Sequence, residues 1–329
     1  MKYYLKRCGF QELGSIGADG KAKRGRYLMS SRHDEILDFF PPLSIEIPND
    51  MALLPVIPLY TRIKTYCSYV YHNSKYTGTQ AKHPRNEYRI YLNNEVENHQ
   101  LYFSSEDIVV MRKGKELLSD GMEQDIYYLD VVKDHSAGIY FFLSHIIESY
   151  PCAGGYGMYD GTLDFIETQV AEYESTQGLP VATIDSSVTR RINGYSNEAR
   201  NSIFNPATFR DFVLAGYDNK CAVTGLKQDA VSNTNLDVIY IRPRAKGGDC
   251  LPSNGIALFS VISPAFVTGE FTLSEQYEIT VHPRSENRYL MSFDHQQIRV
   301  PQNPFFRPGI ENLAYHRENI YGTFCRGQL

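Results

Sequence analysis

The stretch from Tyr217 to Leu273 constrains the fold of this 329-residue chain more than any other part of it. A β-rich apolar run, Leu236 to Ile241, is followed by a basic, glycine-containing loop from Arg242 to Asp249. Ser253-Asn254-Gly255 then opens a mostly apolar stretch that could form one helix, ending near Gly269. This order predicts a β-hairpin, a loop and a helix.

These residues resemble the core of HNH nucleases. The shared framework consists of short motifs along the stretch: Cys221-Ala-Val-Thr-Gly225, Ile241-Arg-Pro243, Gly247-Gly248, Ser253-Asn-Gly255, Ala265-Phe266 and Gly269. Asn201 to Tyr217 is expected to be the helix that leads into this core, and Glu311 to Asn319 resembles the terminal helix of the family. The resemblance covers about residues 200–320 and implies an α+β domain of the HNH-like ββα-metal type.

The catalytic positions of that family are mostly replaced. By the resemblance, the first histidine, which takes the proton from the attacking water, falls on Tyr240. The second histidine falls on Ser263 and a later aspartate on Val267, so that only Asn254 is retained. Tyrosine, with a pKa of about 10, is a poor base at neutral pH, and serine and valine are poor magnesium ligands. We therefore interpret this half as a nuclease framework that lacks conventional hydrolytic activity, and we assign no metal site.

In this interpretation Tyr240 is a core aromatic that fills the space of the imidazole. One other interpretation stays open. A rebuilt catalytic site could use Tyr240 with Asp237, Asp249 or Asn254, and it would need Mg²⁺ to stabilise charge on the phosphate. That site would make the protein an active, metal-dependent restriction endonuclease of the HNH type.

The charge of the chain is unevenly distributed. Residues 1–90 contain 14 Lys and Arg against 8 Asp and Glu, whereas residues 91–329 contain 19 against 30. A basic module ahead of an acidic one is suited to DNA binding, because neutralising phosphates supplies much of the affinity.

The first 150 residues are expected to be mostly β-structure. Short strand-like runs alternate with turn-rich pieces, which favours a β-barrel over a parallel sheet. The expected strands are Tyr3–Lys6, Arg26–Met29, Leu53–Pro58, Tyr66–His72, Glu87–Leu92, His99–Phe103, Asp107–Met111, Tyr127–Val132 and Gly138–Leu143. Ser30–Phe40 is expected to form one short helix that Pro41 stops.

Two basic clusters stand out in this half. The first contains Lys21, Lys23, Arg24 and Arg26 beside a glycine-rich turn, and the second lies between Tyr71 and Leu92. Within the second, Arg85-Asn-Glu87 combines a guanidinium for guanine or phosphate, an amide for adenine and an acceptor for cytosine.

The second cluster resembles the N-terminal effector domain of EcoRII-type restriction endonucleases, a B3-like pseudobarrel that grips the major groove with two arms. Tyr71-His-Asn-Ser-Lys75, Gly78 and Arg85-Asn-Glu-Tyr-Arg89-Ile90 carry this likeness. It implies that Arg85, Glu87 and Arg89 contact bases and phosphates on one arm and that Lys21 through Tyr27 belong to the other arm. Tyr88 stands where the family has a lysine, His83 lies near another basic position, and both are expected with Lys75 to complete the DNA-contacting residues of the first arm.

The sequence thus predicts an α+β protein with a recognition domain at 1–148, a connector at 149–196 and an HNH-like domain at 197–329. Within the connector, Leu163–Tyr173 is an amphipathic candidate helix. The expected function is sequence-specific binding of double-stranded DNA of the restriction-endonuclease type. A homodimer would suit a nuclease that acts on both strands. Six scattered cysteines and the lack of a long apolar run favour a reduced protein of the cytoplasm, away from membranes.

Overall fold

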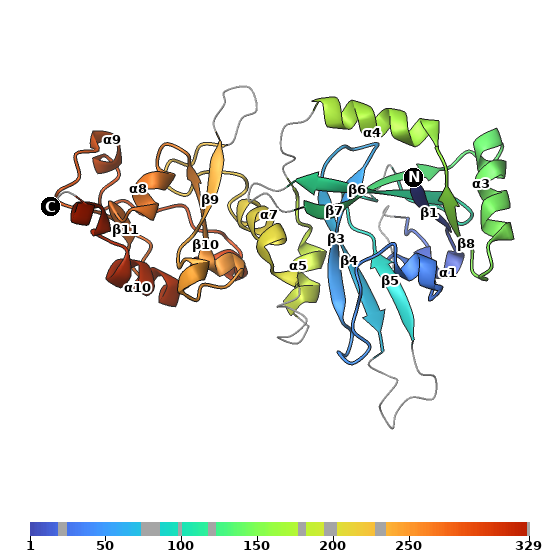
Figure 1. Cartoon of the computed structure of the whole chain (residues 1–329), viewed down its shortest axis with the longest axis horizontal. Helices are drawn as coiled ribbons and strands as arrows, with labels where there is room; N and C mark the ends of the chain where they lie inside the picture. Colours follow the sequence, from blue (N-terminus) through green and yellow to red (C-terminus); the bar gives the residue numbers. More distant parts are fainter. Residues whose placement is uncertain are drawn as a thin grey trace. The chain divides into compact units, whose positions relative to one another are not determined.

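The computed structural model describes residues 1–18, 25–73, 86–97, 101–117, 123–176, 182–193, 203–227 and 235–327 (Figure 1). The chain forms two compact units, Met1–Ile203 and Phe204–Leu329. Within the described ranges, no helix combines the length and apolar character that crossing a membrane requires. All six cysteines are free thiols.

The first unit is built on one eight-stranded sheet with the strand order β2-β5-β4-β3-β7-β6-β1-β8. Neighbouring strands are antiparallel except β3 and β7, which are parallel. The strands are β1 (Lys2–Arg7), β2 (Tyr27–Ser30), β3 (Met51–Pro58), β4 (Thr65–His72), β5 (Glu87–Tyr91), β6 (Ile108–Leu117), β7 (Glu123–Val132) and β8 (Tyr156–Asp160). The helices are α1 (Phe10–Leu13), α2 (Asp34–Leu37), α3 (Gly138–Ser149), α4 (Asp164–Thr176) and α5 (Ser186–Asn193).

The sheet curls around an inner core. Successive residues of a strand face opposite sides, so Tyr4 of β1 joins one core while Tyr3 joins another. The inner core draws side chains from all eight strands, including Leu28 of β2 and Met158 of β8, the two ends of the strand order. Such strands share one cluster only if the sheet bends toward closure. The outer core covers β1, β3, β6 and β7 with α3 and α4.

Side chains connect β2, at one end of the sheet, with β1, the strand next to the other end. The Glu12 carboxylate of α1 accepts hydrogen bonds from Met29 N and from Gly9 N, both at 2.7 Å. It also pairs with Lys6 Nζ at 3.1 Å, and both charged side chains are buried. The Tyr4 hydroxyl donates to Met29 O at 3.3 Å. The predicted mixed α+β fold with a barrel-like sheet is therefore confirmed for this unit.

Several predicted elements differ from those observed. Gly138–Leu143, expected as a strand, forms the first half of α3, because Leu143 and Ile147 are buried at helical spacing. The strand expected at His99–Phe103 is absent from its described part, residues 101–103. Of the helix expected over Ser30–Phe40, only α2 is observed. The segment 149–196, predicted as a connector, supplies β8, α4 and α5 to the first unit.

The second unit is a smaller α+β structure. Its first helix, α7, begins after Asn205, whose side chain accepts hydrogen bonds from Ala207 N and Thr208 N. β9 and β10 pair antiparallel, with Tyr240 opposite Gly255, and α8 follows them. The elements are α7 (Pro206–Gly216), β9 (Leu236–Tyr240), η1 (Arg244–Lys246), η2 (Pro252–Asn254), β10 (Gly255–Phe259), α8 (Ser263–Val267), β11 (Phe271–Leu273), β12 (Ile279–Val281), α9 (Arg288–Met291), η3 (Pro304–Phe306), α10 (Ile310–Asn319) and η4 (Thr323–Gly327).

The prediction of a single helix after Ser253 is wrong. Gly255–Phe259 is instead a fully buried strand, and the helix is limited to Ser263–Val267. A short, continuously apolar run fits a buried strand as well as a buried helix. Gly255 is needed at this point, because a Cβ there would lie 2.2 Å from a methyl of Val213. The strand expected at Ile298–Val300 is not formed either.

Candidate nucleic-acid interface

The two basic segments join the sheet at opposite ends of one strand pair. Lys21, Lys23 and Arg24 lie outside the described residues, as do Lys75, His83 and Arg85. The structure does describe their attachment points. The segment 19–24 leads into β2 at Tyr27, which pairs with Tyr91 of β5. The segment 74–85 links β4 to the other end of β5, where His72 pairs with Glu87. The length of β5 between these ends is about 13 Å, close to the width of about 12 Å of the major groove.

The outer face of β5 carries a fixed set of polar groups between those attachment points. Arg89 pairs with Glu87, and its guanidinium lies over the Tyr27 ring at 4.1 Å. Burial acts to lower the pKa of Arg89, but the hydrogen bond with Tyr91 and the charge of Glu87 outweigh it and raise the pKa above its ordinary value. Arg89 is therefore a permanently charged donor held in one orientation.

Tyr88 faces the other way. It is 7% exposed and stacks on Tyr71, with 4.5 Å between the ring centroids. The alternation along β5 turns Tyr88 into the inner core while Glu87 and Arg89 face outward. The predicted contact between Tyr88 and DNA is thus not available in this structure.

Arg26 is also an interior residue. Its guanidinium forms a two-point ion pair with the Glu97 carboxylate, at 2.6 Å for each bond. It further donates to Leu13 O at 2.8 Å and to Phe103 O at 2.5 Å. Predicted as a DNA contact, Arg26 instead fixes the point where the segment 19–24 enters β2.

Three polar residues from outside β5, His72, Asn49 and Arg191, lie beside its outer face. His72 Nε2 lies 2.8 Å from the Tyr91 hydroxyl, and its Nδ1 lies 3.2 Å from Asn49 Oδ1. Arg191 of α5 places its guanidinium 3.4 Å from the Tyr91 ring centroid. Arg191 lies next to Arg190 in the segment that the sequence predicts as a connector. No sequence signal placed it beside β5, since that contact depends on how α5 folds back onto the sheet.

In the second unit, Asn254 has an internal role. It is fully buried, and its amide donates to Arg242 O at 3.0 Å and to Asp249 O at 2.9 Å. Its Oδ1 accepts from Arg242 N at 2.8 Å. These bonds hold the basic loop from Arg242 to Asp249 in one shape. Arg244 and Lys246 are exposed on that loop, and neither has an ion pair within the described part of the chain.

Among the other positions of the expected catalytic site, the structure brings Asp237 and Ser263 together, whereas Tyr240 packs on a different side chain and Val267 is exposed. The Tyr240 ring stacks on Phe209 at 3.9 Å, and its hydroxyl lies 3.7 Å from Cys250 Sγ. Asp237 accepts a hydrogen bond from the Ser263 hydroxyl. Val267 is 54% exposed.

These residues do not fit a magnesium ion. Asp237 contributes one carboxylate, which is already bonded to Ser263, and the Asn254 amide is bonded to backbone groups. Mg²⁺ prefers near-octahedral oxygen coordination with carboxylates. Within the described ranges, no three His, Cys, Asp or Glu side chains converge in a way that could hold a metal.

Neither a protein-family model nor a curated protein matches the chain. Among solved structures, the chain is similar to the B3 domain of the UbaLAI restriction endonuclease, crystallised with its cognate DNA. That likeness has 15% identity and a TM-score of 0.30 over 48% of this chain and 85% of that one. The chain is also similar to the modification-dependent restriction endonuclease TagI. Here the identity is 14% and the TM-score 0.29, over 78% of this chain and 62% of that one.

Proposed function

We propose that the first unit binds double-stranded DNA in a sequence-specific manner, in the way of the recognition part of a restriction endonuclease. The observation that carries this proposal is the attachment of two basic segments at opposite ends of β5, with Arg89 and Glu87 fixed on the outer face between them. Side chains from both ends and from the strand can meet one major groove, where guanidinium and carboxylate groups distinguish base pairs.

The second unit is proposed to be a nuclease-like framework that binds the DNA backbone and does not cut it by metal-activated hydrolysis. The exposed Arg244 and Lys246 on a loop fixed by Asn254 support backbone binding. The contacts of Tyr240, Asp237 and Ser263 support the lack of hydrolysis, since each is engaged within the fold.

Single substitutions in the segment 74–85 test recognition. Arg85→Ala is expected to relax base preference and to weaken binding to the preferred duplex by about 1–3 kcal/mol. Lys75→Ala is expected to weaken binding to all duplexes alike and to reduce the slope of log affinity against log salt by about 1. Fluorescence anisotropy over a salt series measures both quantities. Lys115→Ala, at an exposed position of β6 paired with Asp125, is the control and should change neither. If Arg85→Ala and Lys75→Ala both bind every duplex as wild type does, the assignment of the segment 74–85 to DNA recognition is wrong.

A cleavage assay tests the second unit. The full chain, incubated with varied duplexes with and without methylated bases in the presence of Mg²⁺ or Mn²⁺, is expected to leave all of them intact. The same preparation should retard those duplexes in a gel, which shows that it is folded and binding. Metal-dependent cuts that disappear in Tyr240→Phe or Asp237→Asn would instead establish an active site in this unit.

A further inference from the structure

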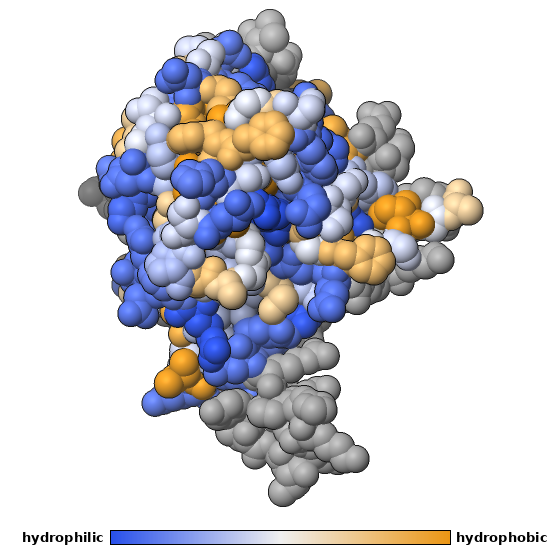
Figure 2. Space-filling view, turned by 90° about the vertical axis from the view of Figure 1, so that its right-hand side faces the viewer, coloured by the Kyte–Doolittle hydropathy of each residue, from blue (hydrophilic) through white to orange (hydrophobic). Residues whose placement is uncertain are grey.

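A hollow of about 570 Å³ lies on the side of the first unit's sheet that α3 and α4 cover. It is bounded by the end of β7, the first turns of α3 and α4, and β8. Figure 2 views the side of the molecule on which α3 and β8 lie and shows apolar groups set between hydrophilic ones. The volume falls within the range of about 300–1,000 Å³ that is typical of ligand sites.

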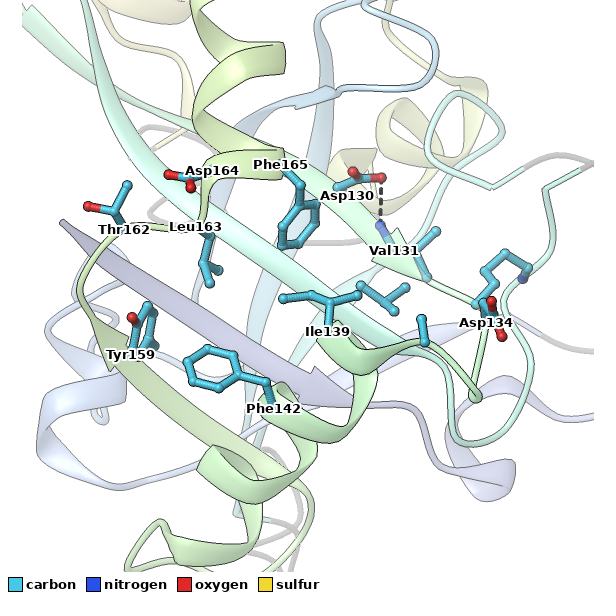
Figure 3. A pocket seen from close by; sticks show the side chains of 13 residues that line it. Asp130, Val131, Asp134, Ile139, Phe142, Tyr159, Thr162, Leu163, Asp164 and Phe165 are labelled. Carbon is cyan, nitrogen blue, oxygen red and sulfur yellow. Dashed lines mark hydrogen bonds between the residues drawn. The ribbon is translucent and has the colours of Figure 1, made fainter.

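Aromatic and aliphatic side chains form much of the lining, as Figure 3 shows. Phe142 of α3 and Tyr159 of β8 meet edge to face, with 5.5 Å between their centroids. Phe165 comes from α4. Leu163, 3% exposed, lines the hollow and also belongs to the outer core. Phe142 remains 45% exposed. The face of an aromatic ring carries partial negative charge, which attracts cations.

Three carboxylates add negative charge to the lining: Asp130, Asp134 and Asp164. Asp130 is fixed by hydrogen bonds from Val131 N at 2.8 Å and Gln169 Nε2 at 2.9 Å. Among the described residues that line the hollow, Lys133 alone is basic. Its Nζ pairs with Asp107 at 2.7 Å and donates to Tyr102 O at 2.7 Å, which leaves the three carboxylates in excess.

We propose that this hollow binds an arginine side chain of a partner polypeptide. The charge of the lining repels phosphate and therefore excludes the DNA backbone. A guanidinium can stack on aromatic faces and donate two parallel hydrogen bonds to a carboxylate, while its methylene stem packs on apolar surface. The hollow complements each of these features.

The openness of the hollow favours a polypeptide over a free cation. Asp134, Asp164 and Phe142 are exposed at its rim. Sites for free small ligands usually bury about 70–90% of the ligand surface, which an open hollow does not achieve. Phe141, 61% exposed on the same helix, offers further apolar surface for residues that flank the arginine.

The test is a calorimetric titration of the full chain with acetyl-Gly-Leu-Arg-Leu-Gly-amide and with its twin carrying citrulline in place of arginine. Citrulline keeps the shape of the side chain and removes its charge. The arginine peptide is expected to bind saturably and the citrulline peptide roughly tenfold more weakly. The double variant Asp134→Asn with Asp164→Asn, and separately Phe142→Ala, should each weaken the arginine peptide by roughly tenfold.

Matched controls come from exposed positions outside the lining. Glu46→Gln and Phe10→Ala, the latter at a residue 67% exposed, should bind the arginine peptide like wild type. Circular dichroism and thermal unfolding verify that every variant is folded. The proposal would be overturned if the two peptides bound equally, or if no peptide bound saturably. It would also be overturned if the Asp134→Asn/Asp164→Asn and Phe142→Ala variants bound the arginine peptide as tightly as wild type. Arginine amide alone binding as tightly as the peptide would overturn its polypeptide part. None of these results depends on whether the chain binds DNA.

Discussion

Replacing Arg26 with alanine is expected to lower the free energy of unfolding of the first unit by about 3–5 kcal/mol, the usual cost of removing one partner from a buried ion pair. The side chains of Arg26 and Glu97 are 5% and 2% exposed. Alanine would leave the Glu97 carboxylate buried without its guanidinium, and it would also leave Leu13 O and Phe103 O without the donors that Arg26 supplies. Urea unfolding followed by circular dichroism measures the loss.

Two further variants separate the structural role of Arg26 from a role in DNA binding. Arg26→Met combined with Glu97→Met removes both charges, and it is expected to recover the part of the lost stability that comes from the unpaired carboxylate, while Leu13 O, Phe103 O and Phe103 N still lack partners. Lys115→Ala, which removes an exposed cation from the same unit, should change stability by less than about 0.5 kcal/mol. If Arg26→Ala were as stable as wild type and its affinity for DNA fell sharply, Arg26 would belong to the interface and the buried ion pair would be wrong.

Lowering the pH is expected to destabilise the second unit through His316. This residue is 1% exposed and stacks on Phe266 at 4.0 Å. Its Nε2 donates to Phe266 O at 3.0 Å, so its Nδ1 accepts from the Thr272 hydroxyl at 2.9 Å. This arrangement needs the neutral ring. Burial is the largest cause that lowers the pKa of His316 from 6.5 to about 4.

The direction of the pH effect follows from that lowered pKa. Below about pH 6.5 the unfolded chain binds a proton at this histidine that the folded chain does not bind until about pH 4. The stabilising contribution is therefore complete above about pH 6.5 and falls as the pH decreases toward 4, by about 2 kcal/mol between pH 7 and pH 5.

Urea unfolding at several pH values, compared between wild type and His316→Gln, measures this contribution as the difference in pH dependence. His295→Gln is the contrasting variant: the hydrogen bond with Glu278 and the charge of Asp294 raise the pKa of this exposed histidine, so its contribution to stability depends on pH with the opposite sign. Equal losses of stability in wild type and His316→Gln between pH 7 and pH 5 would contradict this role of His316.

The sequence predicted three inner strands well because each is a short run rich in β-branched, aromatic or aliphatic residues. β3, β4 and β5 were expected almost at their observed bounds, since each has a clear turn on one or both sides. α3 and β10 were missed for one shared reason: short apolar runs rich in aromatic or branched residues fit a helix and a strand equally well. Long-range packing then decides, as the close approach of Val213 to Gly255 illustrates.

Charge alone could not separate surface from interior residues in the candidate site. Arg26 and Arg89 both belong to basic clusters, yet one is buried against Glu97 and the other lies on the outer face of β5. Glu97, which lies 71 residues after Arg26, gave no sign of this pairing in the sequence. The burial of Tyr88, by contrast, follows from its place between Glu87 and Arg89, and the alternation of β5 could have revealed it.

Selection from random DNA duplexes at a fixed, near-physiological salt concentration tests the central claim most directly, because it measures recognition without presuming cleavage. The full chain is expected to enrich one short sequence, Lys75→Ala to enrich the same sequence with lower yield, and Arg85→Ala to lose preference at one or more of its positions. A wild-type chain that retains every duplex equally would contradict sequence-specific recognition by this protein.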